Sequence, residues 1–324
     1  MQKITNTMAD KSMSGNLALE FVRVTEAAAI AASEWIGRGD KIAADQAAVN
    51  AMRSRLNLIE FQGKVVIGEG EKDEAPMLYT GEKVGKGKAP VMDLAIDPLE
   101  CTDSVAYGRY NALTVIAAGP KGSLLHAPDM YMEKLAVGPA AAKLVDLDAP
   151  VAETIKIVAK ALGKDKREIT VLTLERERHN KLIEEIRAAG ARVRTITDGD
   201  VAGGIAPSLE DSGIDILMAI GASTEAVLAA TAIKVLGGEI LARFTPRDER
   251  DKKALKEAGI SKFDNIFTAD DLVKHDDVIF TATGVIDGPL LNGIIVKGNK
   301  VITHSLVLRG LSKTKRFIIA EHFL

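Results

Sequence analysis

The feature that most constrains the fold is a regular alternation of apolar strand-like runs and amphipathic helix-like runs after residue 150. The pattern predicts helices at 151–162, 178–189 and 224–236, a short helix after Asp200, and strands at 169–174, 191–196, 214–220 and 239–244. Glycines at 163 and 190 follow two of these helices, as is common at helix C-termini. Such alternation is typical of a mostly parallel sheet with helices on both faces, so we expect an α/β protein.

The chain before residue 150 has a different organisation. Its apolar spacing predicts two helices, two strands and a hairpin, at 17–35, 43–59, 64–67, 91–96, and 111–118 with 123–126. The stretch 277–322 is rich in strand-forming residues whose strands could pair with either half. We therefore predict a flexible N-terminal extension (1–16), an N-terminal α+β domain (17–150) and a C-terminal α/β domain (151–324), with a boundary region at 138–150.

Composition excludes several classes of function. The chain has 324 residues, 47% of them hydrophobic, and 42 basic against 45 acidic side chains, a formal net charge of −3. This balance does not favour nucleic acid or an anionic membrane as a partner. No apolar run approaches the ~20 residues of a membrane span, and the polar first residues do not resemble a signal peptide, so we expect a cytoplasmic protein.

The ligand side chains for a zinc site are scarce. Cys101 is the single cysteine, and the five histidines are scattered along the chain without ligand spacing. Any bound metal ion is therefore expected to have oxygen ligands.

Acidic side chains follow two apolar strands. Glu69 and Glu71 come after the first, and Asp97 and Glu100 come after the second. Carboxylates at strand ends lie at the edge of a sheet where α/β proteins place their sites, although each of these acids alone could also lie in a solvated turn. Two carboxylates ~4 Å apart repel by about 4 kcal/mol at an effective dielectric of 20, and Mg²⁺ or Mn²⁺ would relieve that repulsion.

The string Asp97-Pro98-Leu99-Glu100-Cys101-Thr102 resembles the Asp-Pro-(Ile/Leu)-(Asp/Glu)-Gly-(Thr/Ser) signature of the lithium-sensitive, metal-dependent phosphatase superfamily. More narrowly, the chain from about Leu17 to its C-terminus resembles the bacterial class II fructose-1,6-bisphosphatases. Further strings that carry the resemblance lie at 37–45, 66–71, 73–78, 126–134, 198–200 and 282–284.

The resemblance implies a sugar-phosphatase-like, layered αβαβα fold with two sheets. It implies an enzyme of gluconeogenesis that hydrolyses the 1-phosphate of fructose 1,6-bisphosphate, with two or three Mn²⁺ or Mg²⁺ ions as cofactors. It also implies a homo-oligomer, either a dimer or a tetramer.

The resemblance also assigns roles position by position. The implied metal ligands are Asp45, Glu69, Asp97, Glu100 and Glu225. Thr102 and Asp73 would orient and activate the attacking water. The implied substrate-binding residues are Glu100, Cys101, Thr102, Tyr131, Arg176, Glu177, Arg178, Asp198, Gly199, Asp200 and Ala222. Of these, Arg176 and Arg178 would receive the distal phosphate, which suits the planar, permanently charged guanidinium group.

Three positions depart from the family pattern. Cys101 replaces a Gly, Glu177 replaces a residue that is usually Pro, and Ala222 lies in a string where the family reads Gly-Gly-Ala-Pro-Glu-Gly. Since the metal ligands are retained, these changes bear on substrate selectivity more than on chemistry. The alternatives are therefore a sedoheptulose-1,7-bisphosphatase, another sugar or inositol phosphatase, or a weakly active metal-binding regulatory homologue.

Overall fold

The computed structural model describes residues 17–70 and 77–323. The predicted extension 1–16 and the residues Glu71 and Asp73 lie outside the described residues. The helices are α2 (Leu17–Ser33), α3 (Lys41–Leu56), α4 (Thr102–Tyr107), α5 (Val151–Leu162), α6 (Asn180–Ala188), α7 (Val201–Ile205), α8 (Ser223–Leu236), α9 (Glu249–Glu257) and α10 (Ala269–Leu272), with short 3-10 helices η1 (Pro139–Ala141), η2 (Lys166–Glu168), η3 (Glu177–His179) and η4 (Ala206–Ser208). The strands are β1 (Gln62–Ile67), β2 (Lys83–Val84), β3 (Val91–Glu100), β4 (Ala112–Pro120), β5 (Tyr131–Val137), β6 (Thr170–Leu174), β7 (Arg192–Ile196), β8 (Ile216–Ala222), β9 (Glu239–Phe244), β10 (Ile279–Ile286), β11 (Ile295–Lys297), β12 (Lys300–Arg309) and β13 (Thr314–Phe323).

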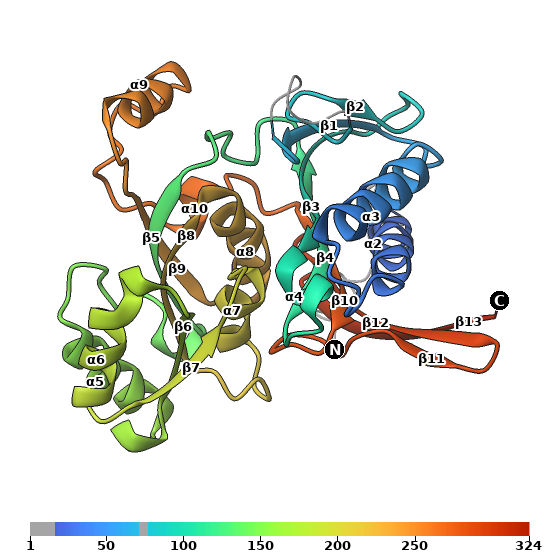
Figure 1. Cartoon of the computed structure of the whole chain (residues 1–324). Coiled ribbons are helices and arrows are strands. Elements are labelled where there is room, and N and C mark those ends of the chain that lie inside the picture. Colours follow the sequence, from blue (N-terminus) through green and yellow to red (C-terminus); the bar gives the residue numbers. More distant parts are fainter. Residues whose placement is uncertain (1–16, 71–76, 324) are drawn as a thin grey trace, which may run out of the picture.

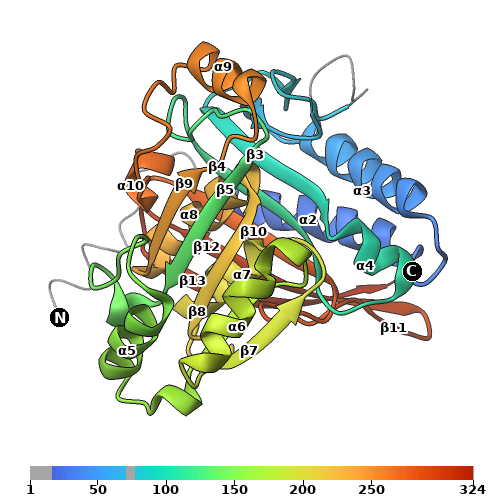
Figure 2. The ribbon, with the colours of Figure 1, turned by 60° about the vertical axis from the view of Figure 1, so that its left-hand side comes forward.

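Within these residues the strands form two sheets. The first has the order β11-β12-β10-β4-β3-β1-β2, with β13 paired to β12, and the second has the order β7-β6-β8-β5-β9. Figures 1 and 2 show α2 and α3 on the outer face of the first sheet, α7 and α8 between the sheets, and α5 and α6 on the outer face of the second. The predicted layered αβαβα fold with two sheets is confirmed.

Three hydrophobic clusters hold the five layers together. The cluster under α2 and α3 includes Phe21, Met52 and Leu94. A central cluster surrounds α8, nine of whose 14 residues are buried, because this helix packs against both sheets. A third cluster, which includes Ile155 and Ile186, lies between the second sheet and the pair α5 and α6.

The structure shows which sheet the strands near the C-terminus join. Strands β10 to β13 all belong to the first sheet, with β10 paired to β4, whereas β5 belongs to the second sheet although it precedes residue 138. The chain therefore passes between the sheets more than once. The predicted domain boundary at 138–150 stays a prediction.

Two sequence-based expectations were wrong. The hairpin of 111–118 with 123–126 does not form, because β4 pairs with β3 and β10 while Leu124 instead makes a bridge to Val273. The second sheet is mixed rather than mostly parallel: β6 runs parallel to β7 and β8, but β5 runs antiparallel to β8 and β9. Alternation of strands and helices cannot anticipate this, because β5 enters the sheet from outside the alternating segment.

Candidate functional site

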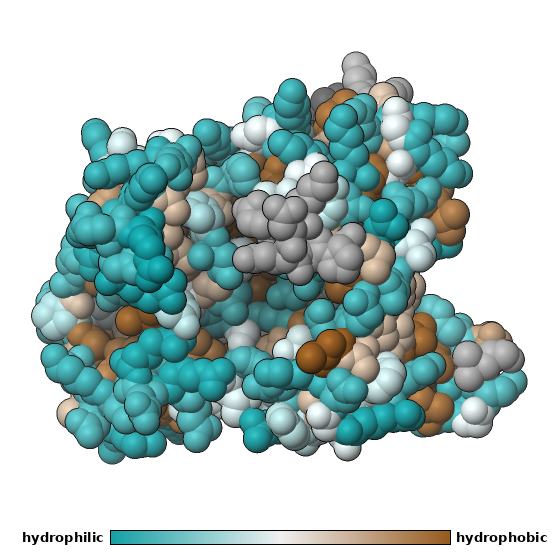
Figure 3. All heavy atoms as spheres, turned by 45° about the horizontal axis from the view of Figure 1, so that its top comes forward, coloured by the Kyte–Doolittle hydropathy of each residue, from teal (hydrophilic) through white to brown (hydrophobic). Residues whose placement is uncertain are grey.

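Acidic side chains from five separate segments converge at the carboxyl end of β3. Asp45 comes from α3, Glu69 follows β1, Asp97 and Glu100 end β3, Asp198 and Asp200 follow β7, and Glu225 lies in the first turn of α8. Asp97 interacts electrostatically with Asp45, Glu225 and Asp198, so these carboxylates share one site. Figure 3, viewed toward the top of the molecule in Figure 1, shows a hollow with a largely hydrophilic lining between the two halves.

One part of this cluster contains carboxylates that lack a paired cation among the described residues. Burial raises the pKa of Asp45 to about 6. Burial, followed by repulsion from Asp97 and Asp45, raises the pKa of Glu69 to about 9. Burial and repulsion from Asp45 and Glu225 raise the pKa of Asp97 to about 7. We call Asp45, Glu69 and Asp97 the unpaired carboxylates.

The other part of the cluster surrounds a buried lysine. The Nζ of Lys134, on β5, donates to Asp200 Oδ1 at 2.6 Å, to Glu225 Oε2 at 3.0 Å and to the carbonyl of Ala222 at 3.1 Å. Burial works against the charge of Lys134, but Asp200 and Glu225 outweigh it, so the pKa of Lys134 is raised. Glu225 also accepts from the backbone N–H of Ala222 at 2.8 Å, and its pKa is lowered, because the ammonium group outweighs the effect of burial. Together these groups form the lysine-paired carboxylates.

Two glycines make room for this packing. A Cβ at Gly221 would collide with Asp200 Oδ2 and would lie 2.7 Å from both Glu225 Oε2 and Lys134 Nζ. Gly199 has φ +58°, and a Cβ there would collide with Cys101 Sγ. No larger residue fits at either position without moving the charged side chains.

The predicted signature string forms the turn from β3 into α4. Cys101 has φ +72°, a left-handed conformation, and its buried Sγ donates to the carbonyl of Asp198 at 3.1 Å and accepts from Asn111 Nδ2 at 3.3 Å. Burial raises the pKa of the Cys101 thiol well above its usual range. Thr102 begins α4 and is half-buried.

Glu100 lies beside this turn, and only one of its two carboxylate oxygens has a hydrogen-bond partner among the described residues. Its Oε1 accepts from the backbone N–H of Val201 at 2.7 Å, while its Oε2 is buried and has no hydrogen-bond partner in the described part of the chain. Burial raises the pKa of Glu100 well above its usual range, and repulsion from Glu225 and Asp97 adds to the rise.

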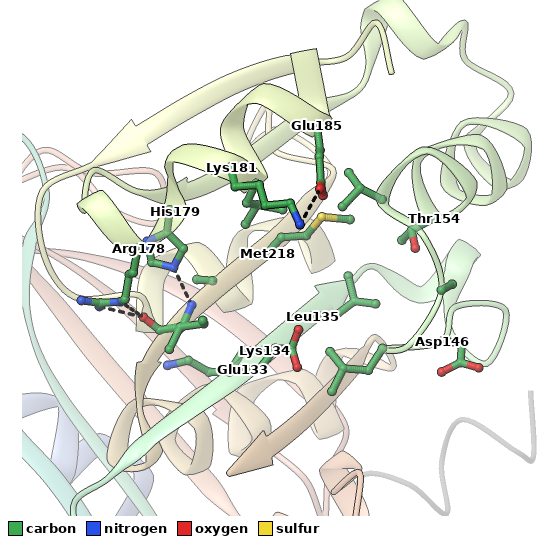
Figure 4. A pocket seen from close by; sticks show the side chains of 16 residues that line it. Glu133, Lys134, Leu135, Asp146, Thr154, Arg178, His179, Lys181, Glu185 and Met218 are labelled. Carbon is green, nitrogen blue, oxygen red and sulfur yellow. Dashed lines mark hydrogen bonds and ion pairs between the residues drawn. The ribbon is translucent and has the colours of Figure 1, made fainter. Parts of the chain in front are cut away.

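Basic side chains surround an exposed tyrosine at the rim. The guanidinium of Arg178 lies 4.8 Å from the centre of the Tyr131 ring, and that of Arg247 lies 5.8 Å from it. Arg178 donates to the carbonyl of Ile220 through Nε at 3.1 Å and Nη2 at 2.8 Å (Figure 4), which fixes its direction. Arg176 pairs with Asp198 at 3.2 Å. A fixed guanidinium beside an aromatic face is suited to an anionic sugar derivative.

A cavity of about 270 Å³ lies behind this rim, between α6 and the second sheet (Figure 4). Arg178 and His179 both line it. His179 is buried, its pKa is lowered to about 4 mainly by burial, and its Nε2 accepts from the N–H of Ile220 at 2.8 Å. This neutral histidine fixes the end of β8, the strand that leads to Ala222 and Glu225.

The donor set fits hard divalent cations. All its members, from Asp45, Glu69, Asp97, Glu100 and Glu225, are carboxylate oxygens, and one of them, Glu100 Oε2, is buried without a hydrogen-bond partner among the described residues. Repulsion between carboxylates also contributes, after burial, to the raised pKa values of Glu69 and Asp97, and a bound cation would relieve that repulsion. Among the described residues, no three ligand side chains lie close enough together to hold a metal ion in this conformation.

The structure thus brings together the predicted site residues that it describes. Asp73 lies outside the described residues, and Glu177 is exposed at the rim in η3. Sequence reasoning missed Lys134, Arg247 and His179. Lys134 could have been found, because in a strand of period two it shares the inward face with Met132 and Ala136.

Comparison with known proteins agrees with this geometry. Residues 15–322 match the family described as bacterial fructose-1,6-bisphosphatase, glpX-encoded. The chain is 46% identical to fructose-1,6-bisphosphatase class 2 of Haemophilus influenzae, over 96% of this chain and 97% of that protein. It is also 46% identical to fructose-1,6-bisphosphatase 1 class 2 of Escherichia coli K12, over 96% of each. Among solved structures, an extragenic suppressor from Pyrococcus furiosus aligns with 59% of this chain at 13% identity and a TM-score of 0.29, too low to establish a common fold.

Proposed function

Because the chain belongs to the glpX-encoded bacterial fructose-1,6-bisphosphatase family, we propose that it hydrolyses the 1-phosphate of fructose 1,6-bisphosphate to give fructose 6-phosphate and phosphate. We further propose that it does so with two or three Mn²⁺ or Mg²⁺ ions, as a cytoplasmic enzyme of gluconeogenesis. In the described part of the chain, no helix has both the length and the apolar character needed to cross a membrane.

The observation that carries the proposal is the convergence of carboxylates that have no cation of the described chain beside them, with Glu100 buried and Asp45, Glu69 and Asp97 half-buried. Asp45, Glu69 and Asp97 would hold one or two divalent ions, and Glu100 and Glu225 would complete the ligand set. When bound, such ions neutralise phosphate oxygens and favour deprotonation of a coordinated water. The carboxylates supply a fixed arrangement of negative charge, so the protein contributes mainly by positioning.

Other side chains would bind and orient the substrate. The hydroxyl of Thr102, at the end of the signature string, would hold the attacking water, and Asp73 would assist it. Tyr131 and Arg178 would contact the sugar and its distal phosphate, since Arg178 is already fixed by the carbonyl of Ile220. Asp198 and Asp200 would accept from sugar hydroxyls.

The test is phosphate release from a panel of substrates in Mn²⁺ or Mg²⁺. We expect fructose 1,6-bisphosphate to be the best substrate, ahead of sedoheptulose 1,7-bisphosphate, fructose 6-phosphate and inositol monophosphate. A clear preference for one of the other three would replace the proposed substrate. Absence of turnover on all four would favour a regulatory homologue.

Arg178→Ala sharpens this test. The variant should raise KM about tenfold for fructose 1,6-bisphosphate and leave hydrolysis of a simple phosphomonoester unchanged, because only a bisphosphate reaches the second phosphate site. Arg192→Ala is the matched control, since Arg192 is exposed on the neighbouring strand β7. An equal loss of activity on both substrates would mean that Arg178 stabilises the fold and does not bind the second phosphate.

A further inference from the structure

Arg247 lies in the short loop between β9 and α9, at the rim of the candidate site. Strand β9 pairs with β5 so that Phe244 lies opposite Met132, and the backbone N–H of Thr245 donates to the carbonyl of Tyr131 at 2.9 Å. Figure 2 shows α9 beyond the end of the second sheet at which β5 begins. The loop that carries Arg247 is therefore attached directly to the first residue of β5.

Two guanidinium groups from separate segments approach the ring of Tyr131. That of Arg178, from η3, lies 4.8 Å from the ring centre, and that of Arg247 lies 5.8 Å from it. Tyr131 is 38% exposed and the side chain of Arg247 is 68% exposed, so a ligand in solution can reach both. An anion bound beside this ring would have both arginines as neighbours, and arginine is the side chain best suited to a phosphate group.

Both guanidinium groups are held in place and still have N–H groups to donate. Arg178 uses Nε and Nη2 on the carbonyl of Ile220 (Figure 4), and within the described residues its Nη1 has no acceptor. Arg247 uses Nε and Nη2 on Asp251, at 3.0 Å and 3.4 Å, and in the part of the chain that the structure describes its Nη1 has no acceptor either. Asp251 also accepts from the backbone N–H of Arg247 at 2.9 Å. Each guanidinium can therefore donate to a phosphate without giving up a present contact.

The charge of Arg247 also reaches the acidic cluster. Burial, followed by repulsion from Glu225, raises the pKa of Asp129, and both Lys134 and Arg247 oppose the rise. Arg247 and the lysine-paired carboxylates thus act on the same side chain, so Arg247 lies within electrostatic reach of the candidate site. The guanidinium of Arg247 is balanced by Asp251, whereas that of Arg178 donates to a carbonyl, which carries no charge.

We propose that Arg247 is a second arginine of the distal phosphate site, so that Arg178 and Arg247 together bind the 6-phosphate of the substrate beside Tyr131. The inference rests on the proposed function, which supplies a sugar with two phosphates. The carboxylate cluster receives the reacting end of this substrate, and the two arginines receive the other end. Arg247 is thus a substrate-binding residue that helps to select a bisphosphate over a monophosphate.

The first experiment measures the binding of fructose 6-phosphate, which carries only the distal phosphate, to the full chain in Mn²⁺ by isothermal titration calorimetry. Arg247→Ala should raise the Kd about fivefold, the size expected for an exposed charged contact. Arg247→Lys should raise it only about twofold, because lysine keeps the charge but not the planar fork. Arg250→Ala is the matched control and should leave the Kd unchanged: Arg250 is 93% exposed on α9, pairs with Asp248 and is not one of the cations beside the Tyr131 ring.

The second experiment separates the arginine from its acidic partner. Arg247→Ala leaves Asp251 without its guanidinium, and repulsion between Asp251 and the phosphate would by itself weaken binding. The double variant Arg247→Ala/Asp251→Asn removes both charges and keeps an oxygen acceptor at position 251. Its Kd for fructose 6-phosphate should still be about threefold higher than that of the wild type. Asp251→Asn alone should lower the Kd about twofold, because the guanidinium then has no competing carboxylate.

The third experiment compares two substrates. Arg247→Ala should raise KM for fructose 1,6-bisphosphate about fivefold and leave kcat unchanged, because the contact is made equally before and during the reaction. Hydrolysis of p-nitrophenyl phosphate, which has no second phosphate, should not change. Inhibition by inorganic phosphate should not change either, since inorganic phosphate binds at the carboxylate cluster.

Three results would overturn the proposal. The first is an unchanged Kd for fructose 6-phosphate in Arg247→Ala, and the second is a double variant Arg247→Ala/Asp251→Asn that binds as tightly as the wild type. The third is an equal loss in Arg247→Ala and Arg250→Ala, which would show a general effect of positive charge on this loop. Absence of turnover of fructose 1,6-bisphosphate by the wild type would refute the proposed function, whereas normal turnover with an unchanged affinity in Arg247→Ala would refute only the role of Arg247.

Discussion

The two parts of the acidic cluster differ in how their charge is balanced. The lysine-paired carboxylates, Asp200 and Glu225, have an ammonium group of the protein within 3.0 Å. The unpaired carboxylates, Asp45, Glu69 and Asp97, have no such partner in the described residues, and their pKa values are all raised. In the lysine-paired group the pKa of Glu225 is lowered, whereas burial and repulsion from Glu225 raise the pKa of Asp200 to about 7 although Lys134 opposes the rise.

This difference shows which acids of the site receive a counter-charge from the protein itself and which do not. A buried acid paired with a cation is held in one position by its own chain. A buried acid without a cation destabilises the fold unless something outside the chain supplies positive charge. Asp45, Glu69 and Asp97 are half-buried and have raised pKa values, so we expect them to lower the stability of the metal-free fold at neutral pH.

The largest effect is expected at Asp97. Asp97→Asn should lower kcat at least ~10³-fold and abolish stimulation by Mn²⁺, because it removes the carboxylate that faces Asp45, Glu69 and Glu225. EDTA should abolish wild-type activity, and Mn²⁺ should restore it. Asp211→Asn, at an exposed turn, is the matched control. Full turnover of the wild type in chelated buffer would contradict the assignment.

The same variant should be more stable than the wild type when metal is absent. The folded pKa of Asp97, about 7, lies above its unfolded value near 4, so the folded state binds more protons between these values and loses stability as pH rises through them. The difference in Tm between Asp97→Asn and the wild type in EDTA should therefore grow from pH 4 to pH 7. A variant that is less stable than the wild type at pH 8 would show that Asp97 is held by a cation.

Replacement of Lys134 is expected to destabilise the protein, whereas replacement of Asp97 is expected to stabilise it in the absence of metal. Lys134→Met keeps the length of the side chain but leaves Asp200 and Glu225 buried without a cation, so the free energy of unfolding should fall by about 3–5 kcal/mol. The loss should be smaller at pH 5 than at pH 8, because protonation relieves the two carboxylates. Urea denaturation measures it, with the exposed Lys297→Met as control. Equal losses at both pH values would mean that Lys134 acts through packing alone.

A feature of the fold or of the site could be predicted from the sequence only where a pattern of neighbouring residues reveals it. Glu69, Asp97 and Glu100 could be found because each follows an apolar strand, whereas Asp45, Asp198, Asp200 and Glu225 are assigned only through the resemblance to a family. The pairing of β10 with β4, which joins the last strands to the first sheet, could not, because it depends on contacts between residues that are more than 150 positions apart. Lys134 has a local signal in the alternation of β5, but its two partners come from the β7–α7 segment and α8, which no local pattern connects.

A smaller effect on activity is expected at Thr102, an uncharged residue of the site. Thr102→Ala should lower kcat about 10²-fold with little change in KM, which is the signature of an interaction made in the transition state. Since Thr102 carries no charge, its loss should leave the metal-free stability and its pH dependence unchanged. Thr102→Ser keeps the hydroxyl and should retain most of the activity. An unchanged kcat in Thr102→Ala would assign Thr102 to the structure of the turn.

The smallest effect is expected at Cys101, where the signature string meets the segment that carries Asp198 and Asp200. Its φ of +72° is a conformation that costs a residue with a Cβ roughly 1 kcal/mol, whereas glycine adopts it freely. Cys101→Gly and Cys101→Ala both lose the Sγ contacts with Asn111 and the carbonyl of Asp198, so a comparison of the two isolates the backbone.

We expect Cys101→Gly to be more stable than Cys101→Ala by about 0.5 kcal/mol in urea denaturation, because the larger entropy of the unfolded glycine chain offsets roughly half of the relieved strain. Both variants should keep the carboxylates of the cluster and hence their response to Mn²⁺. If Cys101→Ala proves as stable as Cys101→Gly, the left-handed turn is not strained. The cysteine would then be retained for its sulfur contacts, which join the end of β3 to the segment that holds Asp200 of the lysine-paired carboxylates.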